Sequence, residues 1–177
     1  LDEALRADPA SPRAHLLRGE RALRDGDHDA AMAAWGALMS HSPGHFALGA
    51  KAYADAAQAT GRGAQARELL ERGYEADPRI ELLQALQQLG DADDPSRIME
   101  HLKHQPTLAS AAAALALTPE RWQPDTAAQV LAAVQRAARP QQRYRCAACG
   151  FEAHHYCWQC PGCQGWDTYP PRQLEAQ

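Results

Sequence analysis

Apolar residues recur at helical spacing along most of the chain. In one segment they fall at Ile80, Leu82, Leu83, Leu86 and Leu89, the three-and-four spacing of a single helix face. An alanine-rich run, Leu108 to Leu117, ends at Thr118-Pro119. Val130, Leu131 and Val134 share one face of a further helix over about 125–138. The pattern therefore predicts a mainly helical chain up to residue 138.

The helical pattern repeats. Pro9, Pro43 and Pro78 are 34 and 35 residues apart, and Gly26 and Gly61 are 35 apart. From Pro12 to Pro43 the chain reads as a helix, a Gly26-Asp27 turn, a second helix and a proline. Such periods are typical of solenoids, in which each unit buries its apolar face against its neighbours.

The first of these units resembles the tetratricopeptide repeat. The small, turn, aromatic and proline positions of that motif are occupied by Gly19, Gly26, Asp27, Ala31, Trp35 and Pro43. We expect Gly19 and Ala31 to let the two helices approach closely, with Trp35 filling the space between units. The second unit keeps Gly61, Ala66 and Pro78. It departs from the motif at Ala54, Leu70 and Gly73.

The expected organisation is a helical-hairpin solenoid over residues 1–138, followed by a small β module. Within the array, 1–9 is the end of a truncated repeat, 12–45 and 47–78 are repeats, and 80–138 are degenerate helices. Because the first helix stops at Pro9, we expect further repeats to precede residue 1. Composition changes from Arg139 onward, so 139–177 is predicted to be a separate domain. Tyr144-Arg145-Cys146 and His155-Tyr156-Cys157-Trp158 alternate as short strands do.

Four cysteines form two Cys-x-x-Cys pairs, Cys146/Cys149 and Cys160/Cys163, with ten residues between them. A two-residue spacer lets one tight turn direct both sulfurs to a single point, and two such turns complete a tetrahedral site for Zn²⁺ or a single iron. Gly150 and Gly162 are predicted to supply the permissive dihedrals of these turns. The alternatives are two disulfides or four ordinary cysteines. A disulfide between cysteines three apart would be strained, and zinc and iron both remain open.

Three other potential ligands lie near these pairs. Cys157 is outside both pairs, and a small buried hydrophobic role is favoured over a ligand or redox role. His154 and His155 lie between the pairs. Either ring could replace a thiolate, but four sulfurs already close the coordination shell.

Charge and motif content narrow the function classes. The formal net charge is −4, and the tail from Arg139 carries only about +1, which does not favour phosphate binding. No apolar run approaches the roughly 18–20 residues of a membrane span. No nucleophile–base pattern, phosphate loop or H-E-x-x-H motif is present, so no enzymatic activity is expected. Thiolates that must stay reduced for metal binding indicate a reducing compartment.

The concave side of such an array is the predicted partner surface. Its candidate positions are Arg13, Glu20, Lys51, Asp55 and Gln58, together with apolar neighbours. Some tetratricopeptide proteins clamp a peptide carboxylate with several Lys and Asn side chains. Asp55 one turn after Lys51 argues against that clamp. The alternative is a solvated face without a partner.

The tail adds a second resemblance. Tyr144-Arg-Cys-x-x-Cys-Gly-Phe151, then Trp158-x-Cys160-Pro-x-Cys163, then Trp166-Asp-Thr168 resembles the lipopolysaccharide assembly protein B family over residues 144–171. The repeats add a general match over 1–78. The resemblance implies a rubredoxin-like module whose metal ligands are Cys146, Cys149, Cys160 and Cys163. Two departures are the additional thiol of Cys157 and Gln164 in place of a knuckle glycine.

This resemblance also implies a function. The family consists of bacterial adaptors held at the cytoplasmic face of the inner membrane by an N-terminal anchor helix. On this resemblance we expect the present chain to be a soluble fragment that lacks the anchor. They promote degradation of the lipid A-committing deacetylase by the membrane protease FtsH, and so limit lipopolysaccharide synthesis. One alternative is an iron-binding electron-transfer or redox-sensing module. Another is an accessory domain of a glycosyltransferase.

Overall fold

The structure is a computed structural model of the 177-residue chain. It describes residues 1–91, 96–117, 131–132, 134–135, 137 and 143–171. The chain divides into two compact units, Leu1–Asp94 and Pro95–Gln177. Among the described residues, no helix is both long and apolar enough to cross a bilayer.

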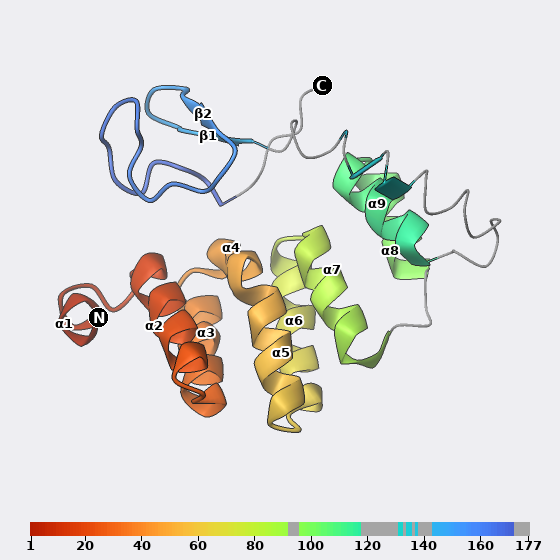
Figure 1. Ribbon diagram of the computed structural model, residues 1–177, viewed down its shortest axis with the longest axis horizontal. Coiled ribbons are helices and arrows are strands. Elements are labelled where there is room, and N and C mark those ends of the chain that lie inside the picture. The colour runs from red at the N-terminus through yellow and green to blue at the C-terminus, as the bar shows by residue number, and fades with distance from the viewer. Residues whose placement is uncertain (92–95, 118–130, 133, 136, 138–142, 172–177) are drawn as a thin grey trace. The chain divides into compact units, whose positions relative to one another are not determined.

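The first unit consists of helices packed in chain order (Figure 1). Their bounds are α1 Asp2–Ala7, α2 Pro12–Arg24, α3 His28–His41, α4 Pro43–Phe46, the 3₁₀ turn η1 Ala47–Gly49, α5 Ala50–Ala59, α6 Gly63–Ala76, α7 Ile80–Leu86 and the π turn η2 Gln87–Asp91. Helix α2 packs on α3, α3 on α5, and α5 on both α6 and α7. The mainly helical fold class is confirmed.

The two predicted hairpin turns are built in the same way. Gly26 and Gly61 both have left-handed φ, +78° and +69°, which glycine adopts without a Cβ penalty. After Gly26, the Asp27 N–H donates to the Ala22 carbonyl at 2.8 Å. After Gly61, the Arg62 N–H donates to the Ala57 carbonyl at 2.8 Å. This six-to-one hydrogen bond over a left-handed glycine is the Schellman ending of a helix.

Trp35 fills the space between the two predicted repeats, as expected. Its side chain is fully buried and lies against two glycines. A Cβ on Gly19 would lie 2.4 Å from the Trp35 ring, and one on Gly49 would lie 3.1 Å from it. Ala31 is also fully buried. The small residues therefore permit the close approach of helices that the sequence suggested.

Two helical segments differ from the sequence prediction. The pattern does not predict α4 and η1, because Pro43 reads there only as the end of a helix. Proline at the first position also favours helix initiation, and Pro43 occupies that position in α4. The predicted helix face through Leu89 extends beyond α7, which ends at Leu86. Leu89 lies in η2, where Gly90 has a φ of +121° that no regular helix contains.

The second unit contains α8 Ser96–His104 and α9 Leu108–Leu117, which pack together, and the strands β1 Tyr144–Arg145 and β2 Glu152–Ala153. The strands are antiparallel, with Tyr144 opposite Ala153 and Arg145 opposite Glu152. The predicted strand at 155–158 is wrong, because these residues form no strand. The turn that begins at Cys146 is short, so Glu152–Ala153 is the segment that pairs with β1. Most of the predicted helix over 125–138 and the domain boundary at 138/139 lie outside the described residues.

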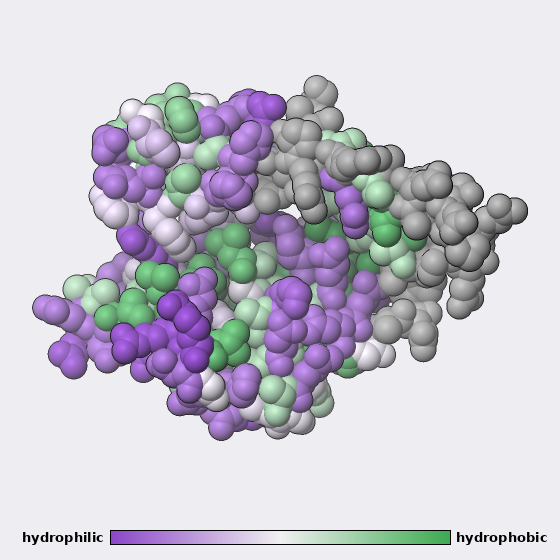
Figure 2. All heavy atoms as spheres, in the orientation of Figure 1, coloured by the Kyte–Doolittle hydropathy of each residue, from purple (hydrophilic) through white to green (hydrophobic). Residues whose placement is uncertain are grey.

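On the face shown in Figure 2, hydrophilic residues dominate the described surface and hydrophobic residues form small separate groups. The exposed large hydrophobic side chains of the described residues are Leu1, Met99, Phe151 and Trp166. Two of these four belong to the C-terminal module.

Candidate metal centre

The first Cys-x-x-Cys turn is held by backbone hydrogen bonds. The Cys146 N–H donates to the Phe151 carbonyl at 3.0 Å, and the Gly150 N–H donates to the Cys146 carbonyl at 2.9 Å. Gly150 has a φ of +77°, so the conformational role predicted for this glycine is confirmed. The turn places Cys146 and Cys149 on one side of the loop.

The second turn repeats this construction with a different residue. The Gln164 N–H donates to the Cys160 carbonyl at 2.9 Å, and the Cys160 N–H donates to the Gly165 carbonyl at 2.8 Å. Gln164 thus stands where Gly150 stands in the first turn, and it adopts a left-handed φ of +61° despite its side chain. A non-glycine residue in this region costs about 1–2 kcal/mol. The geometry of the knuckle therefore persists in spite of the sequence departure.

Gly162 has a different role from the one predicted. It is not among the glycines with positive φ. A Cβ at this position would lie 3.1 Å from the Phe151 side chain. Gly162 is therefore required by the close approach of Phe151 to the second turn and not by its own dihedral angles.

The four sulfur atoms converge. All lie within 4.8 Å of one another, with 3.6 Å between Cys149 and Cys160 and 3.8 Å between Cys146 and Cys163. All five cysteines carry free thiols. A zinc ion bound at about 2.3 Å to four thiolates would space them about 3.8 Å apart. The residues therefore fit a tetrahedral metal ion, as the sequence predicted.

The site is asymmetric in its exposure. The first cysteine of each turn is buried, Cys146 at 1% exposed and Cys160 at 0%, whereas Cys149 and Cys163 are exposed. The buried pair packs with Tyr144 and Tyr169 in a small core. One edge of the centre is thus enclosed by aromatic side chains and the other faces solvent.

Hydrogen bonds and crowding separate the acidities of the thiols. The Thr168 hydroxyl beside Cys146, with further help from backbone N–H groups, lowers the pKa of that thiol to about 6. For Cys149, the Phe151 N–H acts to lower the pKa, but desolvation and the three neighbouring thiols raise it to about 12. For Cys160, desolvation is outweighed by the N–H groups of Cys163 and Gly162, so its pKa is lowered. Because neighbouring thiolates repel one another, the thiols resist ionising together, and a bound cation would stabilise their thiolate forms.

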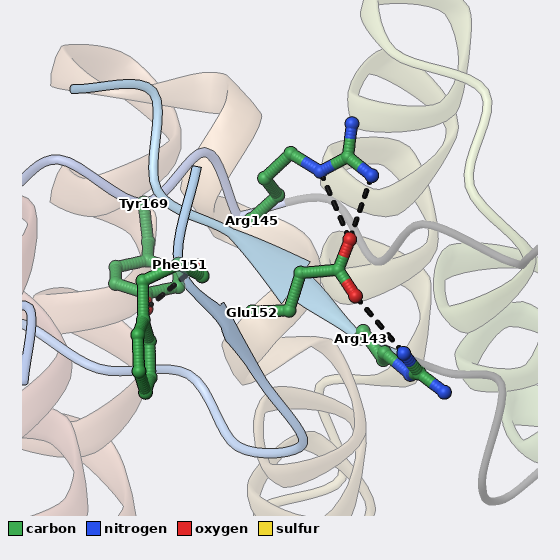
Figure 3. A network of polar contacts seen from close by, with 5 residues as sticks. All are labelled: Arg143, Arg145, Phe151, Glu152 and Tyr169. Carbon is green, nitrogen blue, oxygen red and sulfur yellow. Dashed lines mark hydrogen bonds and ion pairs between the residues drawn. The ribbon is translucent and has the colours of Figure 1, made fainter. Parts of the chain in front are cut away.

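Polar contacts fix the strands that carry the first turn. Figure 3 shows Glu152 of β2 between two arginines: its Oε1 accepts from Arg145 Nη2 at 2.6 Å and its Oε2 accepts from Arg143 Nη1 at 3.0 Å. These hydrogen bonds, Arg145 first, lower the pKa of Glu152. The Tyr169 hydroxyl donates to the Phe151 carbonyl at 3.1 Å (Figure 3), which ties the segment after the second turn to the first.

The other candidate ligands stay outside the sulfur cluster. Among the described residues, the group of potential ligands around this point consists of the four paired cysteines alone. Cys157 is half-buried, packs against the core of the module, and its Sγ lies 3.4 Å from the His155 carbonyl oxygen. His154 and His155 are exposed. The packing role favoured for Cys157 is met in part, because the side chain packs against the core but is half-buried and not fully buried.

The predicted partner-facing residues lie on α2 and α5, and some are engaged within the chain. Lys51 Nζ pairs with Asp55 Oδ2 at 2.9 Å. The Gln88 side chain donates to Asp55, and Gln58 Nε2 donates to the Gln88 carbonyl at 2.6 Å. Glu20 is exposed and Arg13 is half-buried. Sequence reasoning missed the link to Gln88, which no periodic signal marks, and the partner role of all five stays a prediction.

The comparison with known families bears on this module. Residues 144–171 match a LapB-type zinc ribbon model, described as a rubredoxin metal binding domain. The match covers the segment of both cysteine turns, and it does not extend to the helices. No curated protein matches the chain. The C-terminal module is thus rubredoxin-like, with four thiols placed for one tetrahedral ion.

Proposed function

We propose that this protein is a non-enzymatic adaptor that binds other proteins through its helical repeats, with the metal module as a structural part. The observation that carries the proposal is the match of residues 144–171 to a LapB-type zinc ribbon, together with four converging thiols. Helical hairpins with identical glycine turns precede this module in the same chain. Repeat arrays of this kind offer extended binding surfaces.

The chemistry of the centre supports a structural role. Four sulfur ligands complete the tetrahedral coordination of the metal ion and leave no position for an activated water molecule. The small core around Tyr144 and Tyr169 needs a further source of folding free energy, which a bound ion supplies. We therefore assign this module a structural role and not a catalytic one.

The proposed partners follow from the family resemblance. They are the membrane protease FtsH and the deacetylase that commits precursor to lipid A, and the adaptor would act at the cytoplasmic face of the bacterial inner membrane. The outcome would be faster degradation of the deacetylase and less lipopolysaccharide synthesis.

Reconstituted degradation tests this function. Purified deacetylase is incubated with FtsH in membranes, with and without the purified full chain, and its half-life is measured. The chain is expected to shorten the half-life. A variant with all four paired cysteines replaced by serine should lose the effect. Glu20→Lys on α2 should weaken it, while Glu75→Lys, the same charge change at an exposed position of α6, should not. An unchanged half-life with the wild-type chain would refute the adaptor role.

A second candidate is an iron centre for electron transfer or redox sensing. The exposure of Cys149 and Cys163 favours it, because electron transfer requires a metal close to the surface. Elemental analysis with a visible spectrum separates the two. One iron per chain with thiolate charge-transfer bands and a reversible one-electron signal would support this candidate, and one colourless zinc would exclude it.

A further inference from the structure

Thr168 lies between the two cysteine turns and contacts both. Its carbonyl oxygen accepts from the Ala147 N–H of the first turn at 2.8 Å. Its Oγ1 lies 3.2 Å from Cys146 Sγ and 3.4 Å from the Gly165 carbonyl oxygen. A Cβ on Gly165 would lie 2.9 Å from Thr168 Cγ2 and 3.4 Å from Cys163 Sγ. Both branches of the side chain are therefore held in place, one toward each turn.

The hydroxyl can serve either protonation state of Cys146. A hydroxyl has one hydrogen to donate and two lone pairs to accept with. While Cys146 is a thiol, its S–H donates to Thr168 Oγ1, and the hydroxyl hydrogen is directed at the Gly165 carbonyl. When the sulfur is a thiolate, the same hydrogen can turn toward it in a charge-assisted bond.

Burial makes this hydrogen bond matter at Cys146 more than it would at the exposed ligands. Cys146 is only 1% exposed, so water has little access to its thiolate. Cys149 and Cys163 are exposed and can be solvated directly. At the other buried ligand, Cys160, the hydroxyl contact is longer: the Tyr169 hydroxyl donates to the Phe151 carbonyl and lies 3.8 Å from Cys160 Sγ. Cys160 Sγ also accepts from the Gly162 N–H at 3.3 Å.

We propose that Thr168 is a positioning residue of the metal centre, whose hydroxyl donates to the metal-bound Cys146 thiolate and sets both metal affinity and the electron density on that sulfur. Hydrogen bonds from groups beyond the ligands tune metal sites in this way. The inference depends on the metal centre and not on the adaptor role, so each can fail without the other.

Two substitutions separate the hydroxyl from the methyl. Thr168→Val keeps the shape and removes the hydroxyl, whereas Thr168→Ser keeps the hydroxyl and removes the methyl. Zinc affinity of the full chain is measured by competition with a chromogenic chelator. We expect Thr168→Val to lose about 10-fold in affinity and Thr168→Ser to stay within about 2-fold of wild type. Equal affinities for valine and wild type, or equal losses in both variants, would overturn the proposal.

Cobalt substitution supplies a readout that packing alone would not move. Without the hydrogen bond the Cys146 thiolate is more electron-rich, so the thiolate-to-cobalt charge-transfer band of Thr168→Val should shift to lower energy. Thr168→Ser should restore the wild-type position. A band that is the same in all three proteins would contradict the proposed role.

A measurement on the wild-type chain remains decisive if the valine variant does not fold. In the ¹¹³Cd-substituted protein we expect scalar coupling between the metal and the Thr168 hydroxyl proton through Cys146 Sγ. Coupling to the Gly162 amide proton through Cys160 Sγ is the positive control, because that N–H lies 3.3 Å from the sulfur. Detection of the Gly162 coupling without the Thr168 coupling would overturn the proposal.

Discussion

Gly19 of α2 lies directly against the ring of Trp35 in α3, so a larger side chain at position 19 would collide with that ring. Trp35 is fully buried and a Cβ at Gly19 would lie 2.4 Å from its ring. A large buried ring cannot move aside as an exposed side chain can. Gly19→Ala is therefore expected to reduce the free energy of unfolding by about 3 kcal/mol, measured by urea denaturation.

Gly36 is the matched control for this substitution. It also lies within a helix, α3, but nothing is found within 4 Å of a Cβ built on it. Gly36→Ala should leave the free energy of unfolding unchanged or raise it by up to about 1 kcal/mol, because alanine has the higher helix propensity. Similar losses in both variants would show that Trp35 packing is not the cause.

Proton release is the residue-scale prediction for the metal centre. A metal binds thiolates, so every thiol that is protonated beforehand must lose its proton. Near pH 7 the Cys146 thiol, with a pKa of about 6, is mostly ionised, whereas Cys149, with a pKa of about 12, is protonated. Affinity should therefore fall as pH falls, by about tenfold per unit for each proton displaced. Calorimetry in buffers of different ionisation enthalpy measures the number of protons, and a value of zero at pH 7 would contradict the prediction.

At the scale of elements, the hairpin turns depend on one conformation and not on packing. Gly26 and Gly61 have left-handed φ, and nothing lies within 4 Å of a Cβ built on either. Each turn is closed by the same hydrogen bond, from Asp27 to Ala22 and from Arg62 to Ala57. Glycines 35 residues apart therefore end one helix and allow the next to begin in the same way.

This yields a test within a single turn. Gly61→Ala should lower the free energy of unfolding by about 1 kcal/mol, because alanine is strained at a φ of +69°. Gly63, two residues later, begins α6 without a positive φ, so Gly63→Ala should be neutral or slightly stabilising. Thermal or urea unfolding compares the two, and equal effects would refute the conformational explanation.

At the scale of the whole molecule, the helices of the first unit and the metal module of the second differ in what stabilises them. The helices of Leu1–Asp94 share a core built around Trp35, Phe46 and Leu70, all fully buried. The metal module has two strands of 2 residues each and a small aromatic core. Its folding free energy should therefore come largely from the ion.

Metal removal tests this difference. After chelation, amide protection in residues 144–171 is expected to collapse, while that of α2–α7 persists, as measured by hydrogen exchange with mass spectrometry. Adding zinc back should restore protection in the module. Loss of protection in α2–α7 as well would show that these helices and the metal module are energetically coupled.

The sequence by itself determined the features that depend on residues close together in the chain. The glycine turns, the helices between them and the two Cys-x-x-Cys pairs each follow from residues close together in the chain, because caps, dihedral preferences and short spacers act locally. The burial of Trp35 against Gly19 was also foreseeable, since a repeat places both at fixed positions.

Tertiary structure decided the features that depend on residues far apart. Gly162 is needed because Phe151 approaches it, Gln88 engages Asp55 and Gln58 across 30 residues or more, and Thr168 reaches Cys146 from beyond the second turn. Gln164 is held at positive φ by the closure of its knuckle, against its own preference. No periodicity marks such contacts, because they depend on how the chain returns on itself and not on the spacing of residue types along it.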